Sequence, residues 1–147
     1  MSLLELTPHH AGAMATVHEQ CFVTAWGEND FRVFLKLPTY RAFGWVGQEN
    51  ELQAFMLLNV IAPELELSTI CVNPKFTRKG IAFAMLTEAL KKFDTFELCF
   101  LEVSEINSAA IALYSKTGFL RTGIRKNYYK SASGGSENAI LMSYPLK

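Results

Sequence analysis

The segment Val72-Asn73-Pro74-Lys75-Phe76-Thr77-Arg78-Lys79-Gly80-Ile81-Ala82 carries the chain from an apolar stretch, through a basic turn, into a helical pattern. Asn73-Pro74 interrupts the apolar stretch, which predicts that a strand ends at Val72. Beyond the turn, apolar residues keep helical spacing and predict a helix from Gly80 to Phe93. A helix start offers unpaired backbone N–H groups and the positive end of the helix dipole. We therefore predict an anion-binding turn between this strand and this helix.

The side chains of the turn suit an anion. Gly80 lets a ligand approach the backbone closely, Arg78 and Lys79 add positive charge, and the small Ala82 keeps the first helical turn open. The segment has neither the Gly-Lys-Ser/Thr of a Walker A loop nor the G-x-G-x-x-G of a dinucleotide fold. An ordinary capped helix with two solvated cations explains the same residues equally well.

The flanking sequence alternates between strand and helix patterns. The run 96–103 is almost continuously apolar, which is typical of a strand buried on both faces, and Gly118 stands where a left-handed residue often ends a helix. The low-complexity segment 131–136 predicts a loop. The other predicted elements are a helix containing residues 14–21, a hairpin of 43–46 and 52–58, a strand over 65–72, a helix over 107–116 and an antiparallel pair over 119–124 and 139–144. We expect one α/β domain over residues 1–147, with a mixed sheet and covering helices.

Composition excludes several classes of protein. Fourteen Lys and Arg balance 14 Asp and Glu, and this zero net charge argues against a nucleic-acid-binding module. Half of the residues are hydrophobic, which argues against disorder. No apolar run approaches the ~20 residues that span a bilayer. The first residues also lack the features of a signal peptide, so we expect neither membrane insertion nor secretion.

The cysteines and histidines show no metal or disulfide pattern. Cys21, Cys71 and Cys99 are widely spaced among apolar neighbours, and we expect them to be small hydrophobic residues of a reduced core. This expectation favours the cytoplasm. His9, His10 and His18 have no second cluster of metal ligands, so we predict no metal site.

Two residues are candidates for acid–base chemistry. Glu102 lies near the end of the run 96–103, where burial would raise the pKa of a carboxyl group and suit it to act as a general base. Tyr114 shares a helical stripe with Asn107, and its phenol can donate a proton or only pack in the core. Local pattern alone favours an outward-facing Glu102 and a core Tyr114.

Taken in order, these motifs resemble the GNAT superfamily of acetyl-CoA-dependent N-acetyltransferases. The stretch from Leu67 to Leu90 is similar to the cofactor-binding motif of that superfamily. Within it, the likeness is greatest to bacterial enzymes that acetylate the N-terminal alanine of a small-subunit ribosomal protein. The residues that carry this narrower likeness are Leu101-Glu102-Val103, residues 107–114 (NSAAIALY), Gly118-Phe119, residues 124–129 (IRKNYY) and residues 138–142 (NAILM).

The resemblance implies a mixed sheet in which two central parallel strands, ending at Val72 and Val103, splay apart to admit pantetheine. Acetyl-CoA is then the co-substrate, with Glu102 as the general base, Tyr114 as the general acid and no need for a metal. Backbone groups at the end of the strand that finishes at Val72 would polarise the thioester. Amides of the basic turn and of the first helical turn would hold the pyrophosphate. The implied cofactor-binding residues are Ile70, Cys71, Val72, Arg78, Lys79, Gly80, Ile81, Ala82, Phe83 and Asn107.

Three positions depart from the family pattern. Thr77 stands where a long Gln or Arg is usual, Ala82 replaces a common second glycine, and Ala25-Trp26 replaces the Pro-Trp of the ribosomal-protein subgroup. The first change removes a long side chain near the pyrophosphate, and the last affects recognition of the acceptor.

The expected acceptor is the N-terminal α-amine of a protein, an alanine-starting ribosomal protein in the leading hypothesis. The alternatives are a small amine, a different protein N-terminus, or an acyl-CoA-binding regulatory module without turnover. A binding module needs neither Glu102 nor Tyr114, so their presence favours an enzyme. We expect the acceptor groove near Trp26 and Tyr128-Tyr129. As a hypothesis, an acidic rim around it would be formed by Glu28, Asp30, Glu64 and Glu66.

Overall fold

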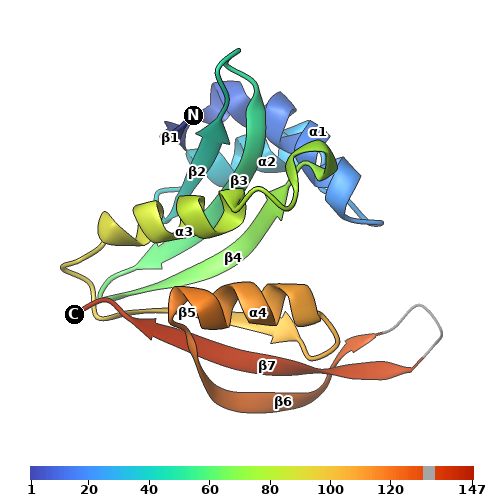
Figure 1. The fold of residues 1–147 in the computed structure, drawn as a ribbon, viewed down its shortest axis with the longest axis vertical. Coiled ribbons are helices and arrows are strands. Elements are labelled where there is room, and N and C mark those ends of the chain that lie inside the picture. Colours follow the sequence, from blue (N-terminus) through green and yellow to red (C-terminus); the bar gives the residue numbers. More distant parts are fainter. Residues whose placement is uncertain (131–134) are drawn as a thin grey trace.

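A single seven-stranded sheet organises the computed structural model, which describes residues 1–130 and 135–147 (Figure 1). The strands are β1 (Ser2–Leu6), β2 (Tyr40–Val46), β3 (Leu52–Ile61), β4 (Glu64–Val72), β5 (Leu98–Ser104), β6 (Leu120–Lys130) and β7 (Ser136–Pro145). Their spatial order is β1-β2-β3-β4-β5-β7-β6. Neighbouring strands are antiparallel, except β4 and β5, which run parallel. The expected mixed sheet is confirmed. The loop predicted over 131–136 falls mainly outside the described residues.

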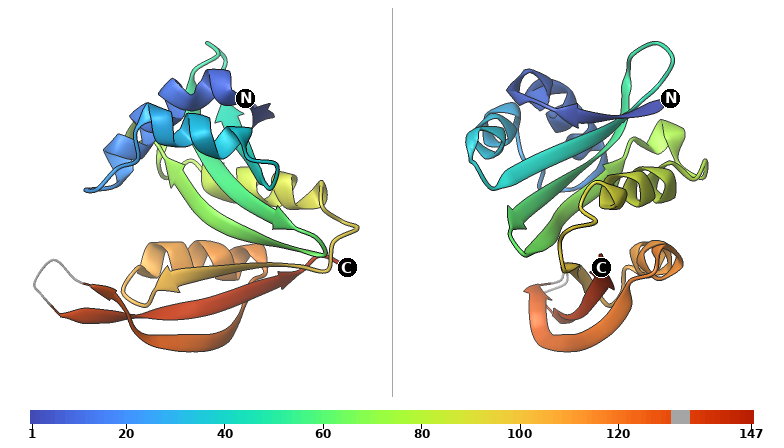
Figure 2. Two further views of the ribbon diagram at one scale, coloured as in Figure 1. Left: turned by 180° about the vertical axis from the view of Figure 1, so that it is seen from behind. Right: turned by 90° about the vertical axis from the view of Figure 1, so that its left-hand side faces the viewer.

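Helices cover both faces of this sheet (Figure 2). On one face lie α1 (Ala11–Cys21) and α2 (Glu28–Lys36), and on the other lie α3 (Ile81–Lys91) and α4 (Ser108–Thr117). Short 3₁₀ helices precede α1 (Pro8–His10) and follow β4 (Pro74–Phe76). The helices predicted from residues 14–21, 80–93 and 107–116 are confirmed. In the described ranges, no helix has the length and apolar character that crossing a membrane requires.

Two apolar cores form, one on each face of the sheet. One core contains Phe43 of β2, Met85 of α3 and Phe93, whereas the other contains Phe31 of α2 and Phe55 of β3. β3 is buried on both faces, because alternate residues of a strand point to opposite sides and both layers of helices reach it.

The prediction that the strand over 96–103 is buried on both faces is wrong. In β5, Cys99, Leu101 and Val103 are buried, while the residues between them are only half-buried. The first helices explain this difference, since α1 packs on β3 and β4 and α2 on β2, and neither covers β5. One face of β5 is therefore left accessible, and Glu102 lies on it.

Two elements do not follow from the sequence patterns used above. β1 is a short strand that pairs with β2. Only its last residue, Leu6, is buried, so buried and exposed residues do not alternate in the way that would mark a strand in the sequence. α2 buries only Phe31, and its start is marked by Gly27, whose N–H donates to a carboxylate oxygen of Asp30 (2.8 Å). The acidic first turn after a glycine cap was the available signal for this helix.

The expectation for the cysteines holds for Cys71 and Cys99, which are buried, and is wrong for Cys21, which is exposed. Cys21 ends α1, and its thiol donates to the carbonyl of Val72 at 3.2 Å. Burial raises the pKa of the Cys71 thiol well above its usual range and raises that of Cys99 to about 12. Both buried thiols therefore stay protonated, as a packing role requires.

Candidate active site

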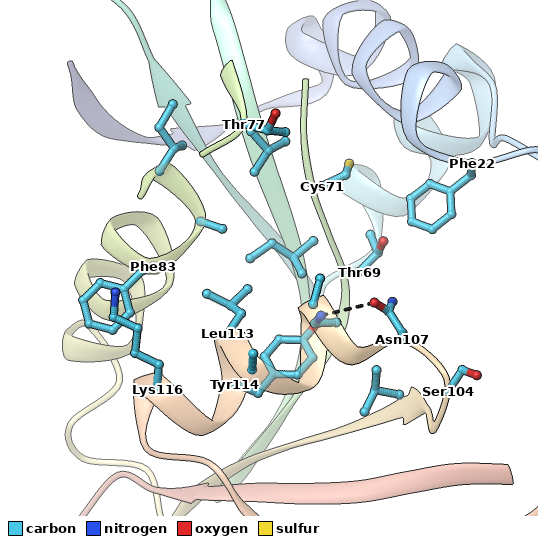
Figure 3. A pocket seen from close by; sticks show the side chains of 18 of the residues that line it. Phe22, Thr69, Cys71, Thr77, Phe83, Ser104, Asn107, Leu113, Tyr114 and Lys116 are labelled. Carbon is cyan, nitrogen blue, oxygen red and sulfur yellow. Dashed lines mark hydrogen bonds between the residues drawn. The ribbon is translucent and has the colours of Figure 1, made fainter. Parts of the chain in front are cut away.

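A cavity of about 730 Å³ opens where β4 and β5 separate. The two strands pair only from Glu64–Glu66 to Leu98–Phe100 and diverge beyond, which confirms the expected splay. Phe22 lies at one end of the cavity, and Phe83 and Lys116 lie at the other (Figure 3). Since Phe22 follows α1 and the other two residues belong to α3 and α4, the cavity connects the two faces of the sheet.

Most of the residues predicted to bind a cofactor or to act in catalysis line this cavity. They are Ile70, Cys71, Val72, Arg78, Gly80, Ile81, Ala82, Phe83, Glu102, Asn107 and Tyr114. Lys79 is the exception: it does not line the cavity, and its Nζ lies 5.6 Å from the ring centroid of Phe76. The structure thus brings the residues of three separate motifs to one place, and their roles in binding stay predictions.

The turn before α3 leaves its backbone open at Gly80. Gly80 has φ +74° and caps the helix, and a Cβ at this position would meet no atom within 4 Å. The N–H of Ala84 donates to the carbonyl of Gly80, so the amides of the turn before it have no helical partner. Thr77 does not reach toward them, because its hydroxyl donates to the carbonyl of Pro74 at 3.0 Å. An anion can therefore approach the first amides of α3 without obstruction.

The end of β4 directs backbone groups into the gap. The N–H of Asn73 donates to Gln53 of β3 at 2.8 Å, and successive residues of a strand direct their N–H groups to opposite edges. The N–H of Val72 consequently faces the side from which β5 has departed. The carbonyl of Val72 accepts a hydrogen bond from the thiol of Cys21. On this edge, the N–H of Val72 is therefore the group available to a ligand.

Glu102 lies on the uncovered face of β5, with its side chain 21% exposed. Its Oε1 is 3.1 Å from Nη2 of Arg125, which comes from β6. Glu66 lies on the adjacent strand, and burial together with the negative charge of Glu102 raises the pKa of the Glu66 carboxyl. Two carboxyl groups therefore lie near one another on the face opposite α3: Glu102, which lines the cavity and pairs with Arg125, and Glu66.

Tyr114 projects from α4 into the middle of the cavity, as Figure 3 shows, and is only 7% exposed. Burial, with a smaller effect of the neighbouring Tyr129, raises the pKa of its phenol to about 12. Its ring packs on Phe119, with centroids 5.7 Å apart. Asn107 caps the same helix through its Oδ1, which accepts the N–H of Ala110 at 3.1 Å. Tyr114 is thus fixed in place and protonated at physiological pH.

A comparison with protein-family models matches residues 12–119 to the acetyltransferase (GNAT) family. The chain belongs to this family. The matched region runs from α1 to the end of α4 and includes β4, the basic turn, β5 and Tyr114. The resemblance inferred from the motifs is therefore confirmed, and with it the assignment of this GNAT protein as an acetyltransferase.

Individual relatives agree with the family assignment. This GNAT chain is 37% identical over 100 residues to a "[Ribosomal protein bS18]-alanine N-acetyltransferase" of Salmonella typhimurium, and the match covers 67% of each chain. The Escherichia coli protein of the same name is 36% identical over 101 residues, covering 67% of this chain and 68% of its own. The crystal structure of the ribosomal-protein-S18-alanine N-acetyltransferase from Escherichia coli superposes with a TM-score of 0.90 at 28% identity, covering 99% of this chain and 94% of that one. Arabidopsis thaliana NAA60 in complex with acetyl-CoA shares the GNAT fold (TM-score 0.84, 16% identity, covering 98% and 97%).

Several residues of this GNAT site lay outside the sequence predictions. Phe22, Ser104 and Lys116 line the cavity, and Arg125 pairs with Glu102. Phe22 comes from a segment whose approach to the cavity depends on long-range packing, so no local pattern marks it. Arg125 lies in the run 124–129 that carried the family resemblance, but its pairing with Glu102 depends on contacts between distant strands. Lys116 lies two residues after Tyr114 on the predicted helix, and this proximity was a usable signal.

The hypothesis of an acidic rim is only partly supported. Glu28 pairs with Arg32 within α2, and Asp30 accepts the N–H of Gly27, so both serve the start of that helix. Glu64 lies where β4 and β5 are still paired. Glu66 lies near Glu102, and burial together with the negative charge of Glu102 raises the pKa of the Glu66 carboxyl.

An aromatic stack holds the segment that carries Phe22. The ring of His18 lies between Phe22 and Trp26, at centroid distances of 4.3 and 5.0 Å. Its Nδ1 accepts the N–H of Trp26 at 3.0 Å, and the side chain is buried. Trp26 therefore packs on the core beneath α1 and α2 and does not line the cavity, whereas Tyr129 does.

This stack predicts a loss of stability in mild acid. Burial lowers the pKa of His18, so the unfolded chain binds a proton at a higher pH than the folded chain does. The stability that neutral His18 contributes is fully present above about pH 6.5 and is lost as the pH falls through the folded pKa. We expect the melting temperature of wild type to fall between about pH 6.5 and 5.5, and that of His18→Asn to fall less. His9→Asn, at an exposed histidine, is the matched control, and equal pH dependence of all three proteins would contradict the prediction.

Proposed function

We propose that this protein transfers the acetyl group of acetyl-CoA to the N-terminal α-amine of a protein, most specifically an alanine-starting ribosomal protein. The observation that carries the proposal is the cavity that joins the two faces of the sheet beside Glu102 and Tyr114. A donor can enter from the α3 face while an acceptor approaches from the face where Glu102 and Tyr129 lie. The names of the bacterial relatives, which are alanine N-acetyltransferases of ribosomal protein bS18, support the choice of acceptor.

The residues at the donor side fit acetyl-CoA, which supplies the activated acetyl thioester. The first amides of α3 and Arg78 are suited to the pyrophosphate, because unpaired N–H groups and the positive end of the helix dipole attract an anion. The passage between β4 and β5 is lined mainly by apolar side chains, which suits the pantetheine arm. The N–H of Val72 faces this passage, where it can stabilise negative charge on the thioester oxygen.

Glu102 is suited to remove the proton of the attacking amine. An α-ammonium group has a pKa of about 7.7–8.0, so at neutral pH only one proton must be taken from a group that is already partly neutral. Lysine, with a pKa of about 10.4, would need a larger shift. Tyr114 can return a proton to the departing thiolate, whose pKa is close to the ~8.5 of cysteine. Arg125 holds the Glu102 carboxylate at the wall of the cavity.

The location of the reaction follows from the same proposal. A ribosomal protein is made in the cytoplasm, and the buried Cys71 and Cys99 are suited to a reducing compartment. We therefore assign the reaction to the cytoplasm.

An acceptor screen with labelled acetyl-CoA tests the proposal. We expect label to enter peptides that begin with the N-terminal sequence of a ribosomal protein starting with alanine, and to be lost when the α-amine is blocked. The same peptide with an internal lysine and a blocked N-terminus controls for side-chain acetylation. Labelling of small amines but not of peptides would contradict the proposed acceptor. Binding of acetyl-CoA without transfer to any acceptor would favour a regulatory module.

A further inference from the structure

Arg125 contacts the candidate base and an aromatic ring at the same time. Its Nη2 lies 3.1 Å from Oε1 of Glu102, and its guanidinium carbon lies 4.6 Å from the centroid of the Tyr128 ring. The side chain of Arg125 is 51% exposed, so its position depends on these two contacts. A guanidinium group is attracted both to a carboxylate and to an aromatic face. Tyr128 therefore favours one position for a long side chain that would otherwise be mobile.

The arginine reaches Glu102 across the strand that separates them. β7 lies between β5 and β6, and its residue opposite Arg125 is Ala139. Ala139 also faces Ser104, two residues after Glu102 on β5, and residues that face each other across antiparallel strands point to one side of the sheet. Ala139 is fully buried but belongs to neither apolar core, which is expected beneath a long side chain that crosses β7.

A bulge in β6 brings Tyr128 to the same side as Arg125. In a regular strand these two residues would point to opposite faces, because they are three positions apart. The register between β6 and β7 shifts between Arg125 and Tyr129, and Asn127 within the shift has φ +55°. The N–H of Asn127 donates to Oδ1 of Asn138 at 2.9 Å, which holds the bulge on β7. Bulges next to active sites re-aim side chains in this way.

Two acidic groups face Glu102 from neighbouring strands. Burial, together with the negative charge of Glu102, raises the pKa of the Glu66 carboxyl on β4 and of the Tyr129 phenol on β6. The repulsion is mutual, so an ionised Glu66 disfavours the negative charge on Glu102. In the ranges that the structure describes, Arg125 is the cation that pairs with Glu102. It offsets this repulsion.

We propose that Arg125, held by Tyr128, is a positioning residue for Glu102 that orients the carboxylate and keeps it ionised for proton removal from the acceptor amine. The inference rests on the proposed function, since it requires Glu102 as the base. With Oε1 bound to Arg125, the other carboxylate oxygen is left to accept the proton. Arg125 acts through Glu102 and transfers no proton itself.

Steady-state kinetics of acetyl transfer to an alanine-starting peptide test the inference. Arg125→Gln is expected to lower kcat about tenfold, the effect of losing one charge-assisted contact, and to leave the KM for acetyl-CoA unchanged. The acid limb of its pH–kcat profile should move to higher pH, because a neighbouring cation favours an ionised carboxylate. Arg125→Lys keeps the charge without the planar fork, so we expect a smaller loss and the wild-type profile. Arg121→Gln, at an exposed arginine of the same strand, is the matched control.

A second set of variants tests whether Tyr128 acts through Arg125. Tyr128→Leu is expected to lower kcat about threefold, the scale of a partly exposed cation–π contact. Tyr128→Phe should lower it less, because the contact needs the ring and not the hydroxyl group. The double variant of Tyr128→Leu and Arg125→Gln should be no slower than Arg125→Gln alone, since both changes remove the same support from Glu102.

Arg125→Gln with the rate and pH profile of Arg121→Gln would overturn the inference and leave the proposed function standing. A loss of kcat with an unmoved acid limb would overturn it as well, because Arg125 would then only support the fold. Multiplied losses in the double variant would overturn the role of Tyr128. A wild type that transfers acetyl to no acceptor would overturn the proposed function and this inference with it. Melting temperatures of the variants show that each has folded.

Discussion

Replacing Glu102 with glutamine is expected to lower kcat/KM by ~10²-fold or more at neutral pH, the size of effect typical of a general base. Glutamine has nearly the shape of glutamate, so the packing of β5 is retained while the proton acceptor is lost. The measurement is the initial rate of acetyl transfer to an alanine-starting peptide. Calorimetry with CoA should show unchanged binding, because Glu102 lies on the face of the sheet proposed for the acceptor, opposite α3.

The dependence on pH separates a base from a residue that only supports the structure. Above about pH 8 the α-amine is mostly neutral without help, since its own pKa is about 7.7–8.0. The deficit of Glu102→Gln should therefore shrink as the pH rises through this range. Glu97→Gln, at an exposed glutamate preceding the same strand, is the matched control. Full activity of Glu102→Gln at neutral pH, or a deficit that is constant with pH, would contradict the assignment.

The parts of the site that follow from sequence are those with a local signature. The basic turn needs only Gly80 at a helix start, and its positive φ and open surroundings are properties of that short segment. Tyr114 and Asn107 share a face because helical spacing puts them there. The resemblance to the GNAT superfamily placed Glu102 in the same site. Its position near the end of a strand did not by itself indicate a function.

The parts that sequence did not predict depend on contacts between distant segments. Arg78 lines the cavity and its neighbour Lys79 does not; Arg78 has a positive φ, and Nζ of Lys79 lies over the ring of Phe76. The partner of Glu102 comes from β6, which reaches it only after β7 has paired with both β5 and β6. Cys21 has apolar neighbours in sequence but is exposed, because it is the last residue of α1.

The opening between β4 and β5 depends both on local sequence and on contacts between distant segments. The register of β4 against β3 shifts between Leu57 and Leu58, so that Leu57 faces Thr69 and Leu58 faces Leu67. The extra residue, Ser68, lies just beyond the last pair of β4 with β5. A bulge increases local twist and bends the strand, which carries the end of β4 away from β5. Polar Ser68 and Thr69 interrupt the apolar strand at this point, but a bulge is not specified by two such residues alone.

Replacing Tyr114 with phenylalanine is expected to lower kcat by about 10²-fold, the lower end of the range that general acid catalysis contributes. The change leaves the ring on Phe119 and removes only the hydroxyl group. Tyr144→Phe is the matched control, since Tyr144 packs on the same Phe119 (centroids 5.4 Å apart) and does not line the cavity. Rates are measured at saturating acetyl-CoA and peptide, so that the comparison concerns the chemical step and not binding.

The raised pKa of Tyr114 fixes the direction of the accompanying pH effect. With a pKa of about 12, the phenol of wild type keeps its proton throughout the range in which the amine and the thiol ionise. Ionisation of Tyr114 should therefore produce no loss of wild-type rate below about pH 10, the ordinary pKa of a tyrosine. The departing thiolate needs a proton less as the pH rises past its own pKa of about 8.5, so the deficit of Tyr114→Phe should decrease there. A Tyr114→Phe deficit that persists undiminished above that pH would instead assign Tyr114 a positioning role, in which its hydroxyl holds the acetyl donor without transferring a proton.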